Sequence, residues 1–157
     1  HFTGEPTPQQ KGANKPVPNL WIMDSVGGTK KPLKGSFKFG YGFQPVWSPV
    51  GDKVAYVGVS TSHACWSKDD TYRADPYCRY RGVAVDVEDV NRGTLKLVRD
   101  NAIDPAWSPD GSWLAFTALD SHQQVDLWIS KPDGSDARRL TDTPELELHP
   151  TWLGRTP

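Results

Sequence analysis

The sequence predicts an all-β fold, a partial β-propeller of four-stranded antiparallel blades, from three observations. A seven-residue pattern occurs twice, from Pro45 to Gly51 and from Pro105 to Gly111, and a third copy begins at 150–152. The tryptophans of the three copies lie 60 and 45 residues apart, and the longer interval contains an insertion at 61–81. A repeat of this period, with several short strands in each unit, is typical of propeller blades.

The chain begins with elements that do not make a whole blade. Residues 1–18 contain four prolines and two glycines and are expected to form an arm or linker. Residues 19–36 read as half a blade, because strand-like residues at 19–24 and 31–34 flank a Gly-Gly turn. The same order of strand and turn recurs from residue 126 to residue 141, in the second half of a later blade.

Two whole blades and one further strand are expected to follow. The first blade spans 44–100, with strands at 44–48, 53–59, 82–88 and 94–99. The second spans 104–142, with strands at 104–108, 113–119, 125–131 and 138–142, and 149–153 is the first strand of a further blade. Residues 19–157 therefore form a partial propeller, to be completed by other copies or by missing chain, because its end blades leave faces and strand edges uncovered.

Five tryptophans are expected to pack between blades, since an indole fills such a space and recurs at matching positions. They are Trp21, Trp47, Trp107, Trp128 and Trp152. In the alternative interpretation, Trp47, Trp107 and Trp152 are platforms that stack on sugars, which requires them to be exposed.

The insertion at 61–81 carries both cysteines, Cys65 and Cys78. Their spacing fits neither a zinc site nor a redox motif, so a disulfide that closes the loop is expected, against the alternative of two unpaired thiols. The loop is also rich in the residue types of protein interfaces, and its aromatic side chains either bind a partner or cover a blade edge. The candidate binding residues are Trp66, Tyr72, Tyr77, Arg79 and Tyr80.

Three polar residues share one position of the repeat, directly before the proline of the innermost strand: Gln44, Asp104 and His149. In a propeller this position lies beside the central channel, so an amide, a carboxylate and an imidazole would converge there. They either bind an axial metal or polar ligand, or satisfy backbone donors of the turn.

Charge and motifs exclude several classes of function. The net charge is −1, with 18 basic and 19 acidic residues, so neither a nucleic acid nor an anionic membrane is an expected partner. No stretch is apolar enough to span a bilayer. The sequence has no nucleophile elbow, phosphate-binding loop, dinucleotide fingerprint or HExxH motif, so no enzyme, cofactor or metal is predicted for the chain alone.

The pattern Pro-x-Trp-Ser-Pro-Asp-Gly-x-x-Leu-Ala-Phe, followed by Asp-Leu-Trp-Ile, Asp-Gly-Ser and Arg-Arg-Leu-Thr, resembles the repeat of TolB-type β-propellers. The resemblance covers 19–152 and is nearly complete in 104–142, whereas Val50 replaces the turn aspartate in the first blade. It implies six or seven blades and a protein-binding role, and it brings no catalytic residue. Similar repeats occur in propellers of prolyl-oligopeptidase-like peptidases and of some pectin-fragment lyases.

The expected function is that of a non-catalytic, exported module, periplasmic or extracellular. It binds a protein partner or assembles with copies of itself into a larger ring or filament. One alternative is a fragment of the propeller of a carbohydrate- or peptide-processing enzyme, with Asp104 and His149 near an axial metal or substrate. Another alternative is a lectin-like glycan binder.

Overall fold

The computed structural model describes residues 20–33, 41–59 and 82–154. All strands of this part of the chain are antiparallel to their neighbours. In chain order they are β1 (Trp21–Met23), β2 (Lys30–Pro32), β3 (Tyr41–Trp47), β4 (Lys53–Val59), β5 (Val83–Asp89), β6 (Thr94–Asp100), β7 (Ala102–Trp107), β8 (Leu114–Leu119), β9 (Val125–Ser130) and β10 (Arg138–Arg139).

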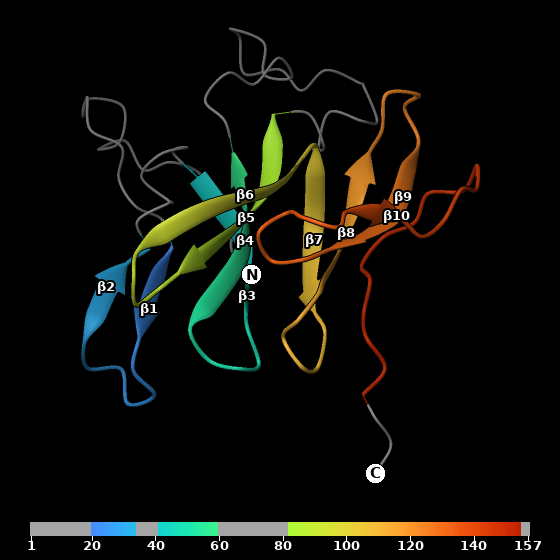
Figure 1. The fold of residues 1–157 in the computed structure, drawn as a ribbon. Helices are drawn as coiled ribbons and strands as arrows, with labels where there is room; N and C mark the ends of the chain where they lie inside the picture. The colour runs from blue at the N-terminus through green and yellow to red at the C-terminus, as the bar shows by residue number, and fades with distance from the viewer. Residues whose placement is uncertain (1–19, 34–40, 60–81, 155–157) are drawn as a thin grey trace, which may run out of the picture.

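The strands form three sheets that stand side by side (Figure 1). Strands β1 and β2 form a hairpin, which we call the leading hairpin. The first blade has the order β3-β4-β5-β6, and the second has the order β7-β8-β9-β10. Each strand pairs with the next along the chain, which is the meander of a propeller blade. The predicted all-β propeller fold is confirmed.

Some strands differ in extent from those predicted. Strand β3 begins at Tyr41 rather than at Gln44, and β10 has two residues instead of five. Residues 149–153 form no strand and pair with none in the described ranges, although a first strand was expected there. An inner strand of a blade is held by hydrogen bonds to the strand beside it, and the described residues provide no such neighbour for 149–153.

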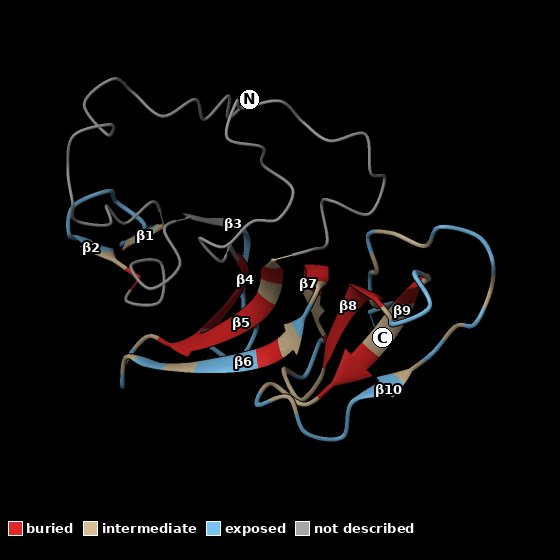
Figure 2. Ribbon diagram, turned by 90° about the horizontal axis from the view of Figure 1, so that it is seen from above, coloured by how far each residue is buried: buried red, intermediate tan, exposed pale blue. Residues whose placement is uncertain are grey.

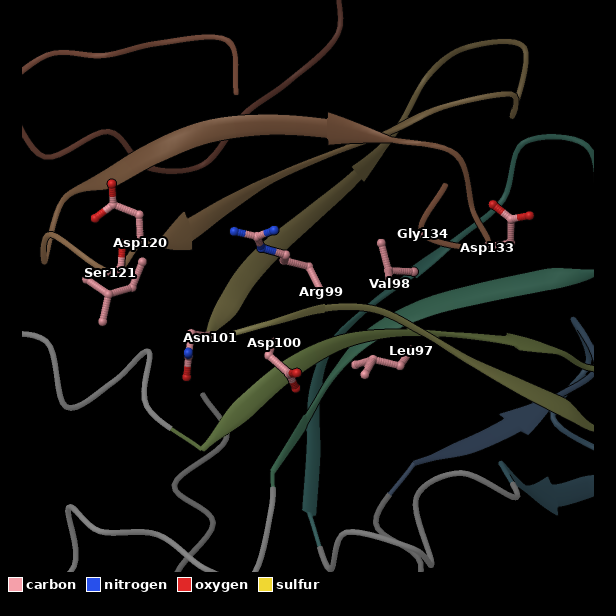
Figure 3. A pocket seen from close by; sticks show the side chains of 10 residues that line it. Leu97, Val98, Arg99, Asp100, Asn101, Asp120, Ser121, Asp133 and Gly134 are labelled. Carbon is pink, nitrogen blue, oxygen red and sulfur yellow. The ribbon is translucent and has the colours of Figure 1, made fainter. Parts of the chain in front are cut away.

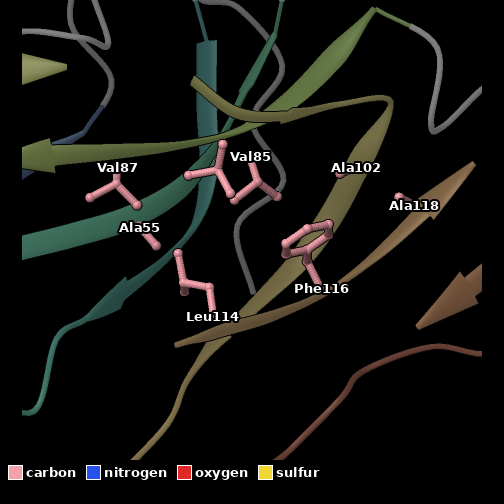
Figure 4. Packing of buried hydrophobic residues seen from close by; sticks show 8 residues of the cluster. Ala55, Val85, Val87, Ala102, Leu114, Phe116 and Ala118 are labelled. Atoms are coloured by element: carbon pink, nitrogen blue, oxygen red, sulfur yellow. The ribbon is translucent and has the colours of Figure 1, made fainter. Parts of the chain in front are cut away.

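The main core lies between the two blades, where small and branched side chains interdigitate (Figure 4). Phe116 is fully buried between the sheets, and Val46, Trp107 and Trp128 pack around the cluster. The buried members of this core are Ala55, Val85, Val87, Val98, Ala102, Leu114, Phe116 and Ala118. Because both sheets contribute, each blade depends on its neighbour for stability.

The leading hairpin covers part of the opposite face of the first blade. Leu33 is buried against Val54 and Tyr56, with Leu20 and Ile22 packed beside them. Burial is concentrated in the middle strands, whereas the leading hairpin and much of β6 are exposed (Figure 2). The hairpin supplies only two strands, so it does not cover this face as a four-stranded sheet would.

Matching turns connect the first two strands of each blade. Gly111 N donates to Ser108 O at 2.8 Å, and Gly51 N donates to Ser48 O at 3.1 Å. Both glycines have positive φ, 69° and 112°, which most other residues avoid. The two turns also touch, because a Cβ built on Gly111 would lie 2.6 Å from Cγ2 of Val50.

Two predicted features lie outside the described residues. They are the arm at 1–18 and the insertion at 61–81, with the disulfide between Cys65 and Cys78. The described residues contain no helix that is long and apolar enough to cross a lipid bilayer.

Candidate axial site and packing faces

The three pre-proline residues share an unusual backbone conformation. Gln44, Asp104 and His149 have φ angles of 52°, 56° and 53°, in the left-handed region that few non-glycine residues adopt. Strand pairing shifts register at the first two positions, which lie at β-bulges inside β3 and β7. The same conformation at three equivalent positions indicates that the repeat sequence itself sets this backbone.

Hydrogen bonds join the three residues in chain order. Asp104 N donates to Oε1 of Gln44 at 3.2 Å, and Nε2 of Gln44 donates to Oδ1 of Asp104. His149 N then donates to Oδ2 of Asp104 at 3.3 Å. The side chains of Gln44 and Asp104 thus each accept from the backbone N–H of the next copy of the motif. We call this arrangement the axial relay.

Asp104 is the centre of the axial relay and its most buried member. The residue is 7% exposed, and its Oδ2 also lies 3.1 Å from Nδ1 of His149 and accepts from Oγ1 of Thr117 at 3.4 Å. Both carboxylate oxygens are therefore engaged within the protein. A buried carboxylate with several donors stabilises the local structure, because it pairs groups that would otherwise lose hydrogen bonds to water.

The axial relay leaves few groups for a ligand. The imidazole of His149 is 71% exposed, and Gln44 is exposed as well. Among the described residues no group of three His, Cys, Asp or Glu side chains is placed to hold a metal ion. The structure brings the three predicted residues together, and its hydrogen bonds fit the alternative in which they satisfy backbone donors. Ligand binding at this position stays a prediction.

Tryptophans connect consecutive blades through a second repeated contact. Nε1 of Trp107 donates to Val46 O at 3.1 Å, and Nε1 of Trp152 donates to Ala106 O at 3.0 Å. In both cases the acceptor is the residue directly before the preceding tryptophan of the repeat. The contact fixes the innermost strand of one blade against the innermost segment of the next.

Two of the predicted packing tryptophans occupy different surroundings. Trp47 is 50% exposed and Trp21 is 55% exposed, and neither belongs to a buried cluster of the described residues. Their equivalents in the second blade, Trp107 and Trp128, pack against the first blade. The difference from the prediction has a physical reason: the described residues place no complete sheet in front of Trp47 or Trp21.

The exposed indoles mark a face of the molecule that we call the leading face. It is the side of the first blade and the leading hairpin that points away from the second blade. Its large exposed apolar side chains are Trp21, Met23 and Trp47. Trp47 lies at the end of β3, opposite Val54, which the leading hairpin covers.

A cleft of about 570 Å³ lies between β6 and the second blade (Figure 3). The guanidinium of Arg99 stacks over the ring of Trp128, 4.2 Å from its centroid, and has no ion pair among the described residues. Asp120 on the opposite wall already accepts from two backbone N–H groups and pairs with Arg139. Sequence reasoning missed this cleft because its walls come from segments of two different blades, far apart in the repeat.

The predicted binding residues of the insertion lie outside the described residues. The interface role of Trp66, Tyr72, Tyr77, Arg79 and Tyr80 therefore stays a prediction.

Comparison with known proteins agrees with the repeat. The Tol-Pal system protein TolB of Anaeromyxobacter dehalogenans is 46% identical over 52 residues, which are 33% of this chain and 12% of that protein. An uncharacterized peptidase, YuxL of Bacillus subtilis, is 43% identical over 110 residues, 69% of this chain and 15% of the peptidase. The chain thus spans about an eighth of the length of the first curated relatives it matches. No family model matches the sequence.

The solved structures define the class of fold. A putative TolB from Agrobacterium tumefaciens superposes with a TM-score of 0.59 at 22% identity, over 83% of this chain and 40% of that one. Stacked four-stranded meanders with this similarity make the chain a β-propeller repeat protein. The sequence match to TolB within the same repeat is more specific. The chain carries a TolB-like β-propeller repeat of about two and a half blades.

Proposed function

We propose that the chain is a non-catalytic propeller module that acts by binding protein through its leading face. The observation that carries the proposal is the exposure of Trp21 and Trp47, at positions whose equivalents in the second blade are covered. Tryptophan and methionine are enriched in protein interfaces, and a tryptophan buried at the centre of an interface contributes strongly to affinity.

The repeat indicates what kind of surface would cover these side chains. Trp107 packs against β-structure and donates its indole N–H to a backbone carbonyl. Trp47 lies in the same Pro-x-Trp-Ser-Pro pattern, so the same partner chemistry suits it: an apolar surface with an accessible backbone carbonyl. A protein surface offers both groups.

Protein binding also agrees with the relatives. One relative is named a Tol-Pal system protein. By analogy, we propose for this chain a role within a protein assembly and export to the periplasm or the extracellular space. The near balance of charges favours a contact made by apolar packing over one made by electrostatic attraction.

The test uses a photo-cross-linking amino acid in place of Trp21, Trp47 or Leu97. Leu97 lies on β6 and is 52% exposed, so it controls for nonspecific cross-linking from an exposed apolar position. We expect positions 21 and 47 to label one identified protein in the fraction of the cell that contains the chain. Labelling that is equal at position 97, or absent at 21 and 47, contradicts the proposal.

A second candidate function is a propeller domain that serves a peptidase. The similarity to YuxL favours it, because that relative is named a peptidase and matches 69% of this chain. In this case the catalytic residues would lie outside these 157 residues. Hydrolysis of a fluorogenic peptide by the pure chain, abolished by a serine-directed inhibitor, would instead place a peptidase in the chain itself.

A further inference from the structure

This inference rests on the proposed function and names the partner. We propose that the leading face binds a second copy of the chain, whose residues 149–153 lie against β3 as β3 lies against β7. The copies then share an interface made of the same contacts that already join consecutive blades within one chain.

The first argument is the acceptor that Trp47 lacks. Two repeated indoles donate to the residue before the preceding tryptophan: Trp107 to Val46, and Trp152 to Ala106. Trp47 has no hydrogen bond of this kind among the described residues. The residue before Trp152 is Thr151, so the repeat offers the carbonyl of Thr151 as the next acceptor in the series.

The contact must lie between copies because of where the two groups sit. The hydrogen bonds order the inner segments as β3, β7 and then 149–153. Trp47 faces away from β7 on one side of this series, and Thr151 lies on the other side. The second blade separates them within one chain, so Trp47 can reach only the Thr151 of another.

The axial relay provides an independent argument. Asp104 N donates to Gln44, and His149 N donates to Asp104, so these two side chains each accept from the following copy of the motif. The imidazole of His149 is 71% exposed, and its Nδ1 faces Oδ2 of Asp104 at 3.1 Å. A neutral imidazole that donates from Nδ1 keeps an acceptor lone pair on Nε2. This lone pair suits the backbone N–H of Gln44 in a second copy.

Coverage of the first blade agrees with this placement. The leading hairpin packs on Val54 and Tyr56 of β4, and Trp47 on the adjacent innermost strand stays exposed. A second copy would add an innermost segment at this open part. If both contacts form reciprocally, two chains close a ring of six blades, within the usual range of about four to eight blades.

In each composite blade of this ring, one copy gives the innermost segment and the other gives the leading hairpin. Residues 1–18 are less suited to the innermost position, because they contain four prolines and no Pro-x-Trp motif.

The experiment uses the pure chain of 157 residues. Light scattering after size-exclusion chromatography is expected to give twice the 17.4 kDa of one chain. Trp47→Ala is expected to shift the mass to that of one chain, and Leu97→Ala is the matched control that leaves it unchanged. Circular dichroism checks that Trp47→Ala still folds, which its half-exposed position favours.

A photo-cross-linking amino acid at position 47 tests the geometry. Mixed isotope-labelled and unlabelled chains are expected to give cross-links between copies that map to 149–153. His149→Ala is expected to raise the dimer Kd about tenfold, the effect of one lost hydrogen bond. His122→Ala is the control, since His122 is an exposed loop histidine outside the axial relay.

Several outcomes overturn the inference: a mass of one chain at micromolar concentration, cross-links within one chain to residues 1–18, or a dimer cross-linked elsewhere. If the pure chain is monomeric while positions 21 and 47 still label another protein in the cell fraction, this inference fails and the proposed function stands. If neither experiment gives a contact at the leading face, both fail.

Discussion

Trp47 and Trp107 occupy the same place in consecutive blades, yet one is half exposed and the other packs against the main core. The same contrast holds for Trp21 and Trp128. The residues directly around the tryptophans match, as Pro-x-Trp-Ser-Pro in one pair and Leu-Trp-Ile in the other, so the difference comes from what lies in front of each blade. In a repeat protein a residue's contribution to stability depends on the neighbouring repeat as much as on its own.

The turns of the two blades also differ, in the hydrogen bonds that hold them. In the second blade, Oγ of Ser108 donates to Asp110 at 2.6 Å, and Asp110 also accepts from Ser112 N at 3.1 Å. In the first blade Val50 stands at the aspartate position and is 63% exposed. Oγ of Ser48 is buried there with no hydrogen-bond partner. One substitution thus removes the acceptor that organises the turn.

The largest expected effect comes from the two tryptophans. Trp107→Ala should lower the free energy of unfolding by about 3 kcal/mol, since it removes a core indole and its hydrogen bond. Trp47→Ala should lower it by less than about 1 kcal/mol in a dilute, monomeric sample. Urea denaturation of both variants measures the difference. Equal losses of unfolding free energy would show that the two tryptophans are equally covered, which contradicts the difference between the blades.

The next effect concerns the axial relay. Asp104→Ala leaves the backbone N–H of His149 without its acceptor and removes the partner of Nε2 of Gln44, and we expect a loss of about 2 kcal/mol. Gln44→Ala should cost about half as much, because Gln44 is exposed and its loss leaves the backbone N–H of Asp104 without an acceptor, while Oδ2 of Asp104 keeps its donors. Asp104→Asn keeps an acceptor and tolerates the left-handed backbone, so thermal unfolding should show partial recovery.

Placing the missing aspartate in the turn of the first blade tests the difference between the two turns. Val50→Asp should raise the free energy of unfolding by about 0.5–1 kcal/mol, because the carboxylate offers an acceptor to the buried hydroxyl of Ser48. Val50→Ala is the control that shortens the side chain without adding an acceptor. A Val50→Asp protein no more stable than Val50→Ala in urea would argue against this account of the turn.

The smallest effect is one of pH. Hydrogen bonds from Ser108 and Ser112 lower the pKa of Asp110 from its ordinary 3.8 to about 2. The folded state therefore binds fewer protons at Asp110 than the unfolded state does. The stabilisation is complete above about pH 4 and is lost as the pH falls through about 2. Asp110→Asn should flatten the acid limb of stability against pH in this window, while Val50→Ala should leave it unchanged.

The repeat pattern predicted the blades because each strand carries its own alternation and each turn its own Gly. It also predicted that Gln44, Asp104 and His149 converge, since equivalent positions in a propeller point to the same axis. It did not predict the left-handed backbone or the direction of the hydrogen bonds, because both depend on a bulge that appears only when the strands pair.

The repeat pattern also did not predict the exposure of Trp47 or the absence of a strand at 149–153. A sequence repeat specifies what a strand can pair with, but the strand forms only where its pairing partner is present. Leu148 and Trp152 still dock on the second blade, which shows that side-chain contacts persist where the backbone ladder does not form. The cleft beside Arg99 likewise arises from neighbours that no single repeat contains.

The indole-to-carbonyl hydrogen bond has a consequence for how such proteins gain blades. Each new unit docks on a main-chain oxygen, which every residue type provides, so duplication of a whole unit creates its own docking site without further substitutions. A gene that copies the segment 104–148 in tandem would encode a longer arc from the outset. Tandem duplication of this segment would therefore add blades while the existing contacts between blades stay intact.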